Sequence, residues 1–239
     1  ELDKDCQGCD LSDAELTRAN LRGANLQGSD LTRANLKGAD LRDADLTQAN
    51  LTDANLTGAN LTGANLLNAD MADVNLELAN LPGINLDGVD LNGCNVGSTN
   101  FCGATLTAVN LSSANAVQVL LERANLVDAN LRNAMLNGAR MNRANLTGAN
   151  LWRASMEVAH LSYANLTGAN LTGAHLSGAD LSDANLTNAN LTRANLTDKF
   201  RAADLSGATL TGANLTGANL TGVDLTGAIG ADLTGAILK

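Results

Sequence analysis

The sequence predicts an all-β solenoid in which the chain winds as a square coil. The first observation is a strict period of five: from Leu11 to Leu196 every fifth residue is a centre, and 32 of these 38 centres are Leu. The second is a small column two residues before each centre, where 29 of 38 residues are Ala. The third is the scarcity of large side chains, since the 239 residues include two Phe, one Tyr and one Trp. A core of Leu and Ala is too thin for ordinary packed layers.

The period also excludes regular helices and alternating strands. A repeat of five matches neither 3.6 nor 2, so neither structure keeps these residues on one face. A square coil does, because each pentapeptide makes one side and four of them return the chain one layer higher. Leu and Ala then face inward, and successive layers lie about 4.8 Å apart, where their backbones can pair.

The repeat unit identifies a family resemblance. Units such as Ala54-Asn55-Leu56-Thr57-Gly58 resemble the A(D/N)LXX motif of pentapeptide-repeat proteins, and they cover residues 9–239 almost without interruption. The resemblance implies a right-handed quadrilateral β-helix of about 11 coils. We therefore expect one solenoid domain over residues 9–239, preceded by a lead-in over residues 1–8.

Departures from the repeat mark the places where the coil should change. Ala116 is a small centre surrounded by larger residues, which predicts a repacked side or a bulge. The segment 197–201 shifts the phase by four, which we interpret as a one-residue deletion at a corner, and a second slip falls at 228–232. Larger residues replace Ala between 74 and 119, so this stretch should widen or shift. They are Val74, Ile84, Val89, Cys94, Thr99, Val109 and Val119.

Cys6 and Cys9 lie at the N-terminal end of the repeats. A structural disulfide that clamps the first turn is the interpretation we favour, and it would indicate an oxidising compartment. A thioredoxin-like redox pair or half of a zinc site stays open, although no βαβ pattern or second ligand pair accompanies these cysteines. Cys94 should point inward and Cys102 outward, both as free thiols.

The sequence offers little to an enzyme. The two histidines, His160 and His175, fall on different sides of the coil, and neither is accompanied by a nucleophile, paired carboxylates or a metal-ligand set. The glycines recur at the repeat period as corner residues and form no phosphate-binding loop. We predict a non-catalytic protein with no cofactor and no metal.

Acidic residues are concentrated in the N-terminal half. Residues 1–120 contain 16 acidic and 6 basic residues, whereas residues 121–239 contain 9 of each. Because positions 20 apart should stack, an acidic stripe is expected along one side, with Arg33 as its only cation. Its members are Asp10, Asp13, Asp30, Asp53, Asp70, Asp73 and Asp90.

A second candidate surface centres on Trp152, which falls one residue after a centre and should face outward. Arg132 lies one coil below it, and Arg153 follows it. Aromatic residues beside arginine are common binding hot spots. Alternatively, the ring lies flat over a neighbouring coil and covers side-chain stems.

Three functions remain open. The first is a scaffold that binds an unknown protein partner, as a monomer or an end-to-end dimer. The second follows from the resemblance: some pentapeptide-repeat proteins are DNA-mimicking rods that bind DNA gyrase, and an acidic stripe suits that role. An acidic surface also simply keeps a rod soluble. The third is a thiol redox protein using Cys6 and Cys9.

Location and other partners are predicted more coarsely. Exported family members that begin with a similar C-x-G-C-D-L segment imply the periplasm or the thylakoid lumen, with the cytoplasm as the alternative. No run of about 18 apolar residues is present, so membrane insertion is not expected. No basic patch with interleaved aromatics is present either, so direct nucleic-acid binding is not expected.

Overall fold

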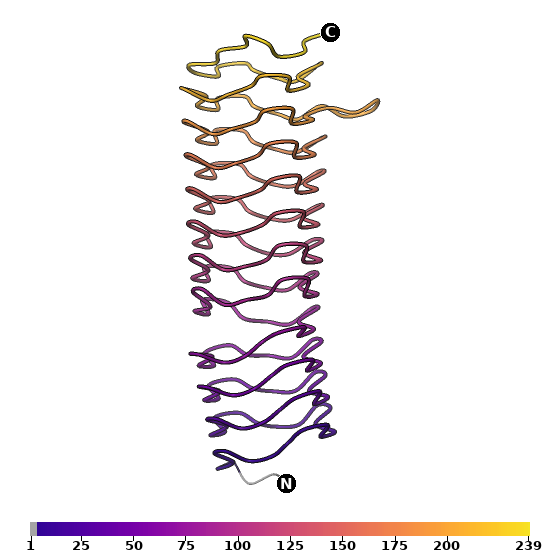
Figure 1. The fold of residues 1–239 in the computed structure, drawn as a ribbon, viewed down its shortest axis with the longest axis vertical. Helices are drawn as coiled ribbons and strands as arrows, with labels where there is room; N and C mark the ends of the chain where they lie inside the picture. Colours follow the sequence, from indigo (N-terminus) through magenta and orange to yellow (C-terminus); the bar gives the residue numbers. More distant parts are fainter. Residues whose placement is uncertain (1–3) are drawn as a thin grey trace.

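The protein forms a long rod built from stacked coils (Figure 1). In the computed structural model, which describes residues 4–239, residues pair in parallel with the residue 20 positions later, as in Asn25 with Asp45 and Asn35 with Asn55. These pairs are single-residue bridges separated by turns, and residues 4–239 contain neither a helix nor an extended strand. One coil therefore takes 20 residues in four five-residue sides.

Outside one interrupted layer, hydrogen bonds between coils satisfy the backbone on each side. The N–H of a centre donates to the coil above, as Leu26 does to the Asp45 carbonyl oxygen at 2.8 Å. The N–H of the preceding residue donates to the coil below, as Asn35 does to the Ala14 oxygen at 2.9 Å. Buried backbone groups need such partners, so the stacking of coils replaces the ladder of a conventional sheet.

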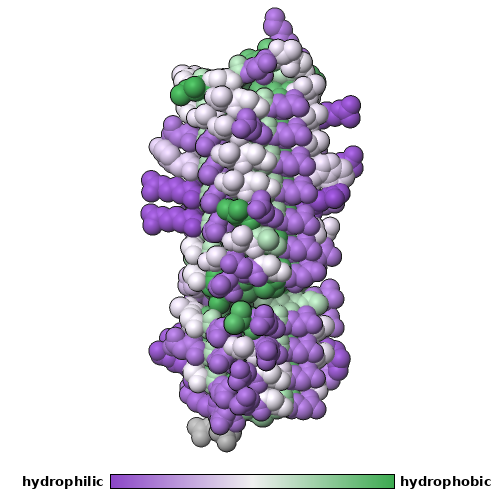
Figure 2. Space-filling model, turned by 60° about the vertical axis from the view of Figure 1, so that its left-hand side comes forward, coloured by the Kyte–Doolittle hydropathy of each residue, from purple (hydrophilic) through white to green (hydrophobic). Residues whose placement is uncertain are grey.

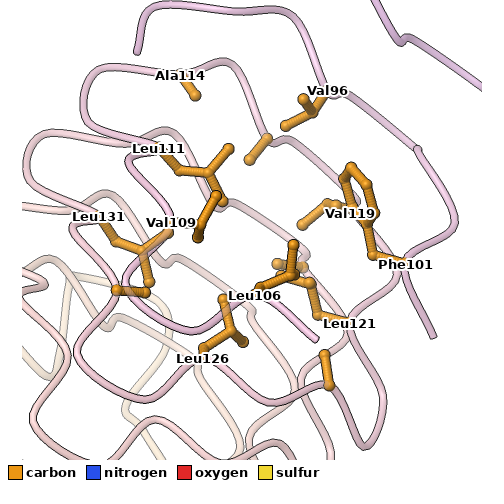
Figure 3. Close-up of a cluster of buried hydrophobic side chains, with 14 of the residues drawn as sticks. Val96, Phe101, Leu106, Val109, Leu111, Ala114, Val119, Leu121, Leu126 and Leu131 are labelled. Carbon is orange, nitrogen blue, oxygen red and sulfur yellow. The ribbon is translucent and has the colours of Figure 1, made fainter. Parts of the chain in front are cut away.

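The interior is a single column of aliphatic side chains, as the repeat predicts. Figure 3 shows Leu106, Leu111 and Leu126 directed into this column, with Phe101 beside Val119. The Leu and Ala positions are almost all buried, whereas the other three positions of each pentapeptide are partly or fully exposed. At Ala116 no bulge occurs, because its N–H keeps the regular bond to the Met135 oxygen at 2.8 Å.

Corner geometry explains the glycine column. The residue two after each centre has a left-handed backbone, with φ near +67° at Gly58 and +59° at Asp53. Glycine adopts this region without steric cost, whereas a β-branched residue such as Val158, at φ +50°, is strained.

The Asn/Asp column holds each corner in shape. The Asn55 side-chain oxygen accepts the backbone N–H of Thr57 at 3.1 Å and its hydroxyl at 2.6 Å. Asn and Asp favour such local turns, and a Thr two residues later adds the second bond. Amides also link coils, as Asn100 Nδ2 donates to Asn80 Oδ1 at 2.6 Å.

The segment 197–201 corrects one expectation from the sequence. Before it the pairing interval is 20 residues, but Asp180 pairs with Asp204, 24 positions later. Thr197 and Ala202 form an antiparallel bridge, so a loop projects from an otherwise regular coil (Figure 1). The prediction of a one-residue deletion was wrong: four residues are inserted. Both changes shift a five-residue phase equally, which is why the sequence pattern did not separate them.

The second slip shortens the last coil. Thr209 pairs with Ile229, 20 positions later, but Asn219 pairs with Ile237, only 18 positions later. The shortening falls within the predicted segment 228–232. Beyond it the core positions are partly or fully exposed, and 49% of Leu238 is exposed.

Stacking is interrupted once in the N-terminal half, between residues 66–74 and 85–94. The bridges expected between Asn65 and Asn85 and between Asp70 and Asp90 are missing among residues 4–239. This upper coil is the only one within 9–194 that has no Ala in the small column. Its four members are Ile84, Val89, Cys94 and Thr99. Larger side chains overfill the narrow interior, so the layers separate.

Candidate interaction surfaces

The first turn is closed by a disulfide. Cys6 and Cys9 are bonded, with their Cα atoms 5.2 Å apart. Cys6 is buried at a centre position, and the Cys9 N–H donates to its carbonyl oxygen at 3.2 Å. The crosslink therefore lies where the expected clamp places it. Residues 1–3 of the predicted lead-in lie outside the described part of the chain.

The other two cysteines are free thiols. Cys94 is buried, and its Sγ points to the Met71 carbonyl oxygen at 3.8 Å. Cys102 is half-buried on the outside and donates to Glu122 Oε2 at 3.0 Å. Burial raises the pKa of each thiol to about 11. Both therefore stay protonated near neutral pH, where a thiol is a poor nucleophile.

The acidic stripe is brought together only in part. Asp10 and Asp30 pair directly, but the pair expected between Asp70 and Asp90 is absent because the coils separate there. Part of the charge is also neutralised. Arg33 binds Asp13 through two bonds of 2.7 and 2.6 Å, which lowers the pKa of that carboxyl. Asp53 and Asp73 occupy left-handed corners of the same face.

Two arginine side chains pack against Trp152 on the outer surface. The Arg132 guanidinium carbon lies 4.8 Å from the centre of the indole, and that of Arg153 lies 4.4 Å away. Each distance is within the range of a cation–π contact. The indole is half-buried in this stack, so the three predicted residues are brought together and both earlier interpretations of Trp152 agree with its position.

The opposite side of the coil, half a turn from Trp152, carries a second aromatic contact. Tyr163 is 57% exposed, and Arg143 lies 5.5 Å from its ring centre. One coil away, Arg140 pairs with Glu122 at 2.7 Å.

The interrupted coils form a cleft of about 570 Å³, which the sequence did not indicate as a site. Apolar side chains and carboxylates line it together, including Leu67, Met71, Val89, Asp87 and Asp90. Figure 2 shows hydrophobic surface exposed in the lower half of the rod, among polar side chains. The sequence feature that corresponds to this cleft is the run of large residues at the Ala positions, Ile84, Val89, Cys94 and Thr99.

Within residues 4–239, no group of three or more His, Cys, Asp or Glu side chains is arranged to hold a metal ion. In the same part of the chain, no helix has the length and hydrophobicity to span a membrane. His160 and His175 lie on different sides of the coil and pair with different residues, Asp180 and Asn195.

Comparison with known proteins decides the family. The family described as pentapeptide repeats matches in eight copies, over residues 9–48, 39–77, 49–88, 84–123, 124–162, 159–198 and 199–239. The chain is a pentapeptide-repeat protein. Comparison with curated sequences finds no match.

Solved structures of other pentapeptide-repeat proteins are similar to it. HetL, involved in heterocyst differentiation regulation in the cyanobacterium Nostoc sp. strain PCC 7120, is 34% identical. The match covers 90% of this chain and 93% of HetL, with a TM-score of 0.45. A pentapeptide-repeat protein of the Arabidopsis thaliana thylakoid lumen is 28% identical over 56% of this chain and 69% of its own, with a TM-score of 0.20.

A third structure is that of QnrB1, a plasmid-mediated fluoroquinolone resistance protein. It is 20% identical over 85% of this chain and 90% of its own, with a TM-score of 0.48.

Proposed function

We propose that this pentapeptide-repeat protein is a non-catalytic scaffold that binds a protein partner through its outer faces. The proposal includes the finer geometry implied by the family, a right-handed quadrilateral β-helix of about 11 coils. The observation that carries it is the stack of Trp152 between Arg132 and Arg153. Aromatic and arginine side chains dominate binding hot spots, and here a rigid rod holds them in place.

Substitution of Trp152 by Thr, the residue usual at this position, tests the proposal. Loss of an outward side chain leaves the aliphatic column intact, so the melting temperature should stay nearly unchanged. Capture of a partner from an extract of the source cells, measured by quantitative mass spectrometry, should fall about tenfold or more, the effect of a typical hot spot. Thr192→Ser, at the equivalent position two coils above, is the control. A lower melting temperature with unchanged capture would refute the proposed role of Trp152.

We further propose that the protein acts in an oxidising compartment, the periplasm or the thylakoid lumen. The disulfide between Cys6 and Cys9 supports this, because such bonds persist where thiols are not kept reduced. Localisation by a fluorescent fusion expressed in the source organism would test it, and a cytoplasmic signal would contradict it.

A second candidate function is modulation of a DNA topoisomerase by an acidic rod. The observation that favours it is the net charge of −10 carried by residues 1–120, since 16 acidic and 6 basic residues give 6 − 16 = −10. Such a surface can resemble the phosphate charge of DNA. A supercoiling assay with purified gyrase separates the two functions. A pure scaffold, added at micromolar concentration, leaves the rate of supercoiling unchanged. A DNA mimic lowers that rate or protects gyrase against inhibition.

A further inference from the structure

The cleft between the separated coils has unpaired backbone on both rims. On the lower rim, the N–H groups of Leu66, Asn68 and Met71 have no backbone partner among residues 4–239. On the upper rim, the same holds for the N–H groups of Asn85 and Asp90. The carbonyl groups that would have received these bonds lie on the opposite rims. Exposed rows of unpaired donors and acceptors are templates for an added strand.

The opening is closed at both ends, which fixes its length. The Leu61 N–H donates to the Asn80 oxygen at 2.9 Å before it, and the Leu76 N–H donates to the Asn95 oxygen at 2.8 Å after it. The rims thus diverge over two successive sides of the coil, centred on Leu66 and Met71, and over the corner between them. About five extended residues, at roughly 3.3 Å each, span one side of the coil.

The walls of the cleft define which side chains an inserted segment needs. Leu67, which is 58% exposed, and Val89 supply apolar surface. Asp70, Asp87 and Asp90 supply negative charge, and no ion pair involves them in the part of the chain that the structure describes. Asp87 accepts the Thr107 N–H at 2.7 Å and Asp90 the Asn110 amide at 2.8 Å, both from the next coil, so these neutral bonds leave the negative charge unbalanced.

Basic residues are absent over a long stretch around the cleft. Between Arg42 and Arg123 the sequence has no Lys, Arg or His. It has nine acidic residues there: Asp43, Asp45, Asp53, Asp70, Asp73, Glu77, Asp87, Asp90 and Glu122. The chain itself therefore supplies no cation to this region, and charge complementarity favours a cationic occupant.

We propose that this cleft binds an extended, cationic segment of a partner protein, which adds a strand between the two separated coils. On the side centred on Leu66, its backbone pairs with the free groups of Leu66 below and of Asn85 above. Side chains alternate along a strand, so its cationic side chains face outward to the aspartates and its aliphatic side chains face inward to Leu66 and Leu86. The inference deepens the proposed scaffold role, but it concerns a surface far along the chain from Trp152.

The probe is a fluorescent six-residue peptide, acetyl-(Lys-Val)₃-amide, titrated against the full chain by fluorescence anisotropy. We expect saturable binding that weakens as salt is raised. Acetyl-(Glu-Val)₃-amide should not bind, because it reverses the charge. A (Lys-Val)₃ peptide with methylated valine amides should not bind either, because it lacks half of the backbone donors. Equal binding of any of these controls would overturn the proposal.

Variants of the protein give an independent test. Asp87→Asn with Asp90→Asn should weaken binding roughly tenfold, since two charge contacts are lost. The matched control is Asp204→Asn with Asp224→Asn, two paired residues of a closed coil, and it should have no effect. Ile84→Ala with Val89→Ala and Cys94→Ala restores the small column and should close the rims, so binding should disappear. Unchanged affinity in both cleft variants would refute the site.

Hydrogen exchange keeps the proposal testable if a variant fails to fold. In the free wild-type protein the amides of Leu66, Met71, Asn85 and Asp90 should exchange quickly, while Leu56, bonded to the Asn75 oxygen at 2.8 Å, exchanges slowly. The saturating peptide spans one side and should slow the amides of Leu66 and Asn85. If they are already as slow as Leu56, the coils are closed in solution and the proposal fails.

A second copy of this chain is the alternative occupant of the cleft. The loop 197–201 carries Lys199 and Arg201, so a second copy of the chain could offer cationic residues. A dimer seen by sedimentation that disappears in Lys199→Glu with Arg201→Glu, and that the peptide also dissociates, would assign the cleft to a second copy. That result would overturn the assignment to a partner protein. Failure of the Trp152 test would leave every one of these measurements unaffected.

Discussion

The inward side chains differ sharply from the outward ones in their tolerance of charge. Leu131 is fully buried among aliphatic side chains, so Leu131→Asp places a carboxylate where it has no polar partner. We expect a loss of about 4 kcal/mol or more in the free energy of unfolding. Thr172→Asp loses one hydroxyl bond to Asn170, of 2.7 Å, and should cost no more than about 1 kcal/mol.

Urea denaturation followed by circular dichroism measures both changes. Equal losses for the two variants would contradict the assignment of these residues to the inside and the outside of the coil.

Corner residues permit a matched pair of substitutions that changes backbone strain. Val158 has φ +50°, a conformation that is costly for a β-branched residue, so Val158→Gly should raise the stability by about 1 kcal/mol. Gly168 has φ +67° and nothing within 4 Å of the position of an added Cβ. Gly168→Val should therefore destabilise by about 1–2 kcal/mol through strain alone.

Thermal melts of the two corner variants should shift in opposite directions. A shift in the same direction would show that the side-chain contacts of the two valines outweigh the backbone term.

Among the elements, the loop 197–201 depends on one carboxylate. Asp198 Oδ1 accepts the N–H groups of Phe200 and Arg201 at 2.7 and 2.8 Å. A hydrogen bond from Ser177 and these two backbone N–H groups lower the pKa of Asp198 from 3.8 to about 2. Because the folded-state pKa is lowered, the stabilisation is complete above about pH 4 and is lost as the pH falls through about 2.

Nuclear magnetic resonance can follow the loop during acidification. The amide signals of Phe200 and Arg201 should move with a midpoint near pH 2, and Asp198→Ala should abolish that titration. A midpoint near 3.8, the ordinary value, would show that the carboxylate does not hold the loop in solution.

The disulfide is expected to have a local effect, because it closes a loop with a sequence separation of only three. Reduction should accelerate hydrogen exchange at Cys6 and Gly8, whose N–H groups bond to the second coil, and leave Leu51 unchanged. The unreduced protein should be lighter by two hydrogen atoms in the peptide that contains both cysteines. Two free thiols in protein kept from reductant would contradict the crosslink.

The period of five was sufficient to predict the square coil, since only inward positions are restricted to Leu and Ala. The period did not determine the structure at two places, the segment near residue 197 and the coil that contains Ile84 and Val89. A phase shift near residue 197 is the same for a loss of one residue and a gain of four, and only the pairing of Asp180 with Asp204 distinguishes them. The large residues Ile84 and Val89 indicated a disturbed coil, but whether the layers widen or separate depends on how the adjacent layers pack.

The cluster around Trp152 could also be predicted from the sequence. Stacking at intervals of 20 placed Arg132 beside Trp152, because both occupy the same position in successive coils. The cleft could not be predicted from the sequence, since its donors and acceptors are backbone groups that every sequence contains.

For the whole molecule, stability should propagate only between neighbouring coils. The interrupted layer has lost several bonds between Leu66 and Asp90, so cooperativity should be weakest there. Leu26→Asp should therefore unfold the coils up to this layer and leave those beyond it folded. We expect hydrogen exchange at Leu51 to rise by about 100-fold or more, a change of about 3 kcal/mol, with Leu171 unchanged. Equal acceleration at both residues would show that the rod unfolds as one unit.

The hydrogen bonds between coils run along the axis of the rod, and this gives the molecule a mechanical property. A force applied to the two ends loads the layers in series, so every layer carries the same tension. The force at which the rod first lengthens is then set by its weakest layer and does not rise with the number of coils. Stretched end to end, this protein should act as a stiff spring that yields first at the separated coils around Leu66 and Asn85, and a ligand seated there would raise its yield force.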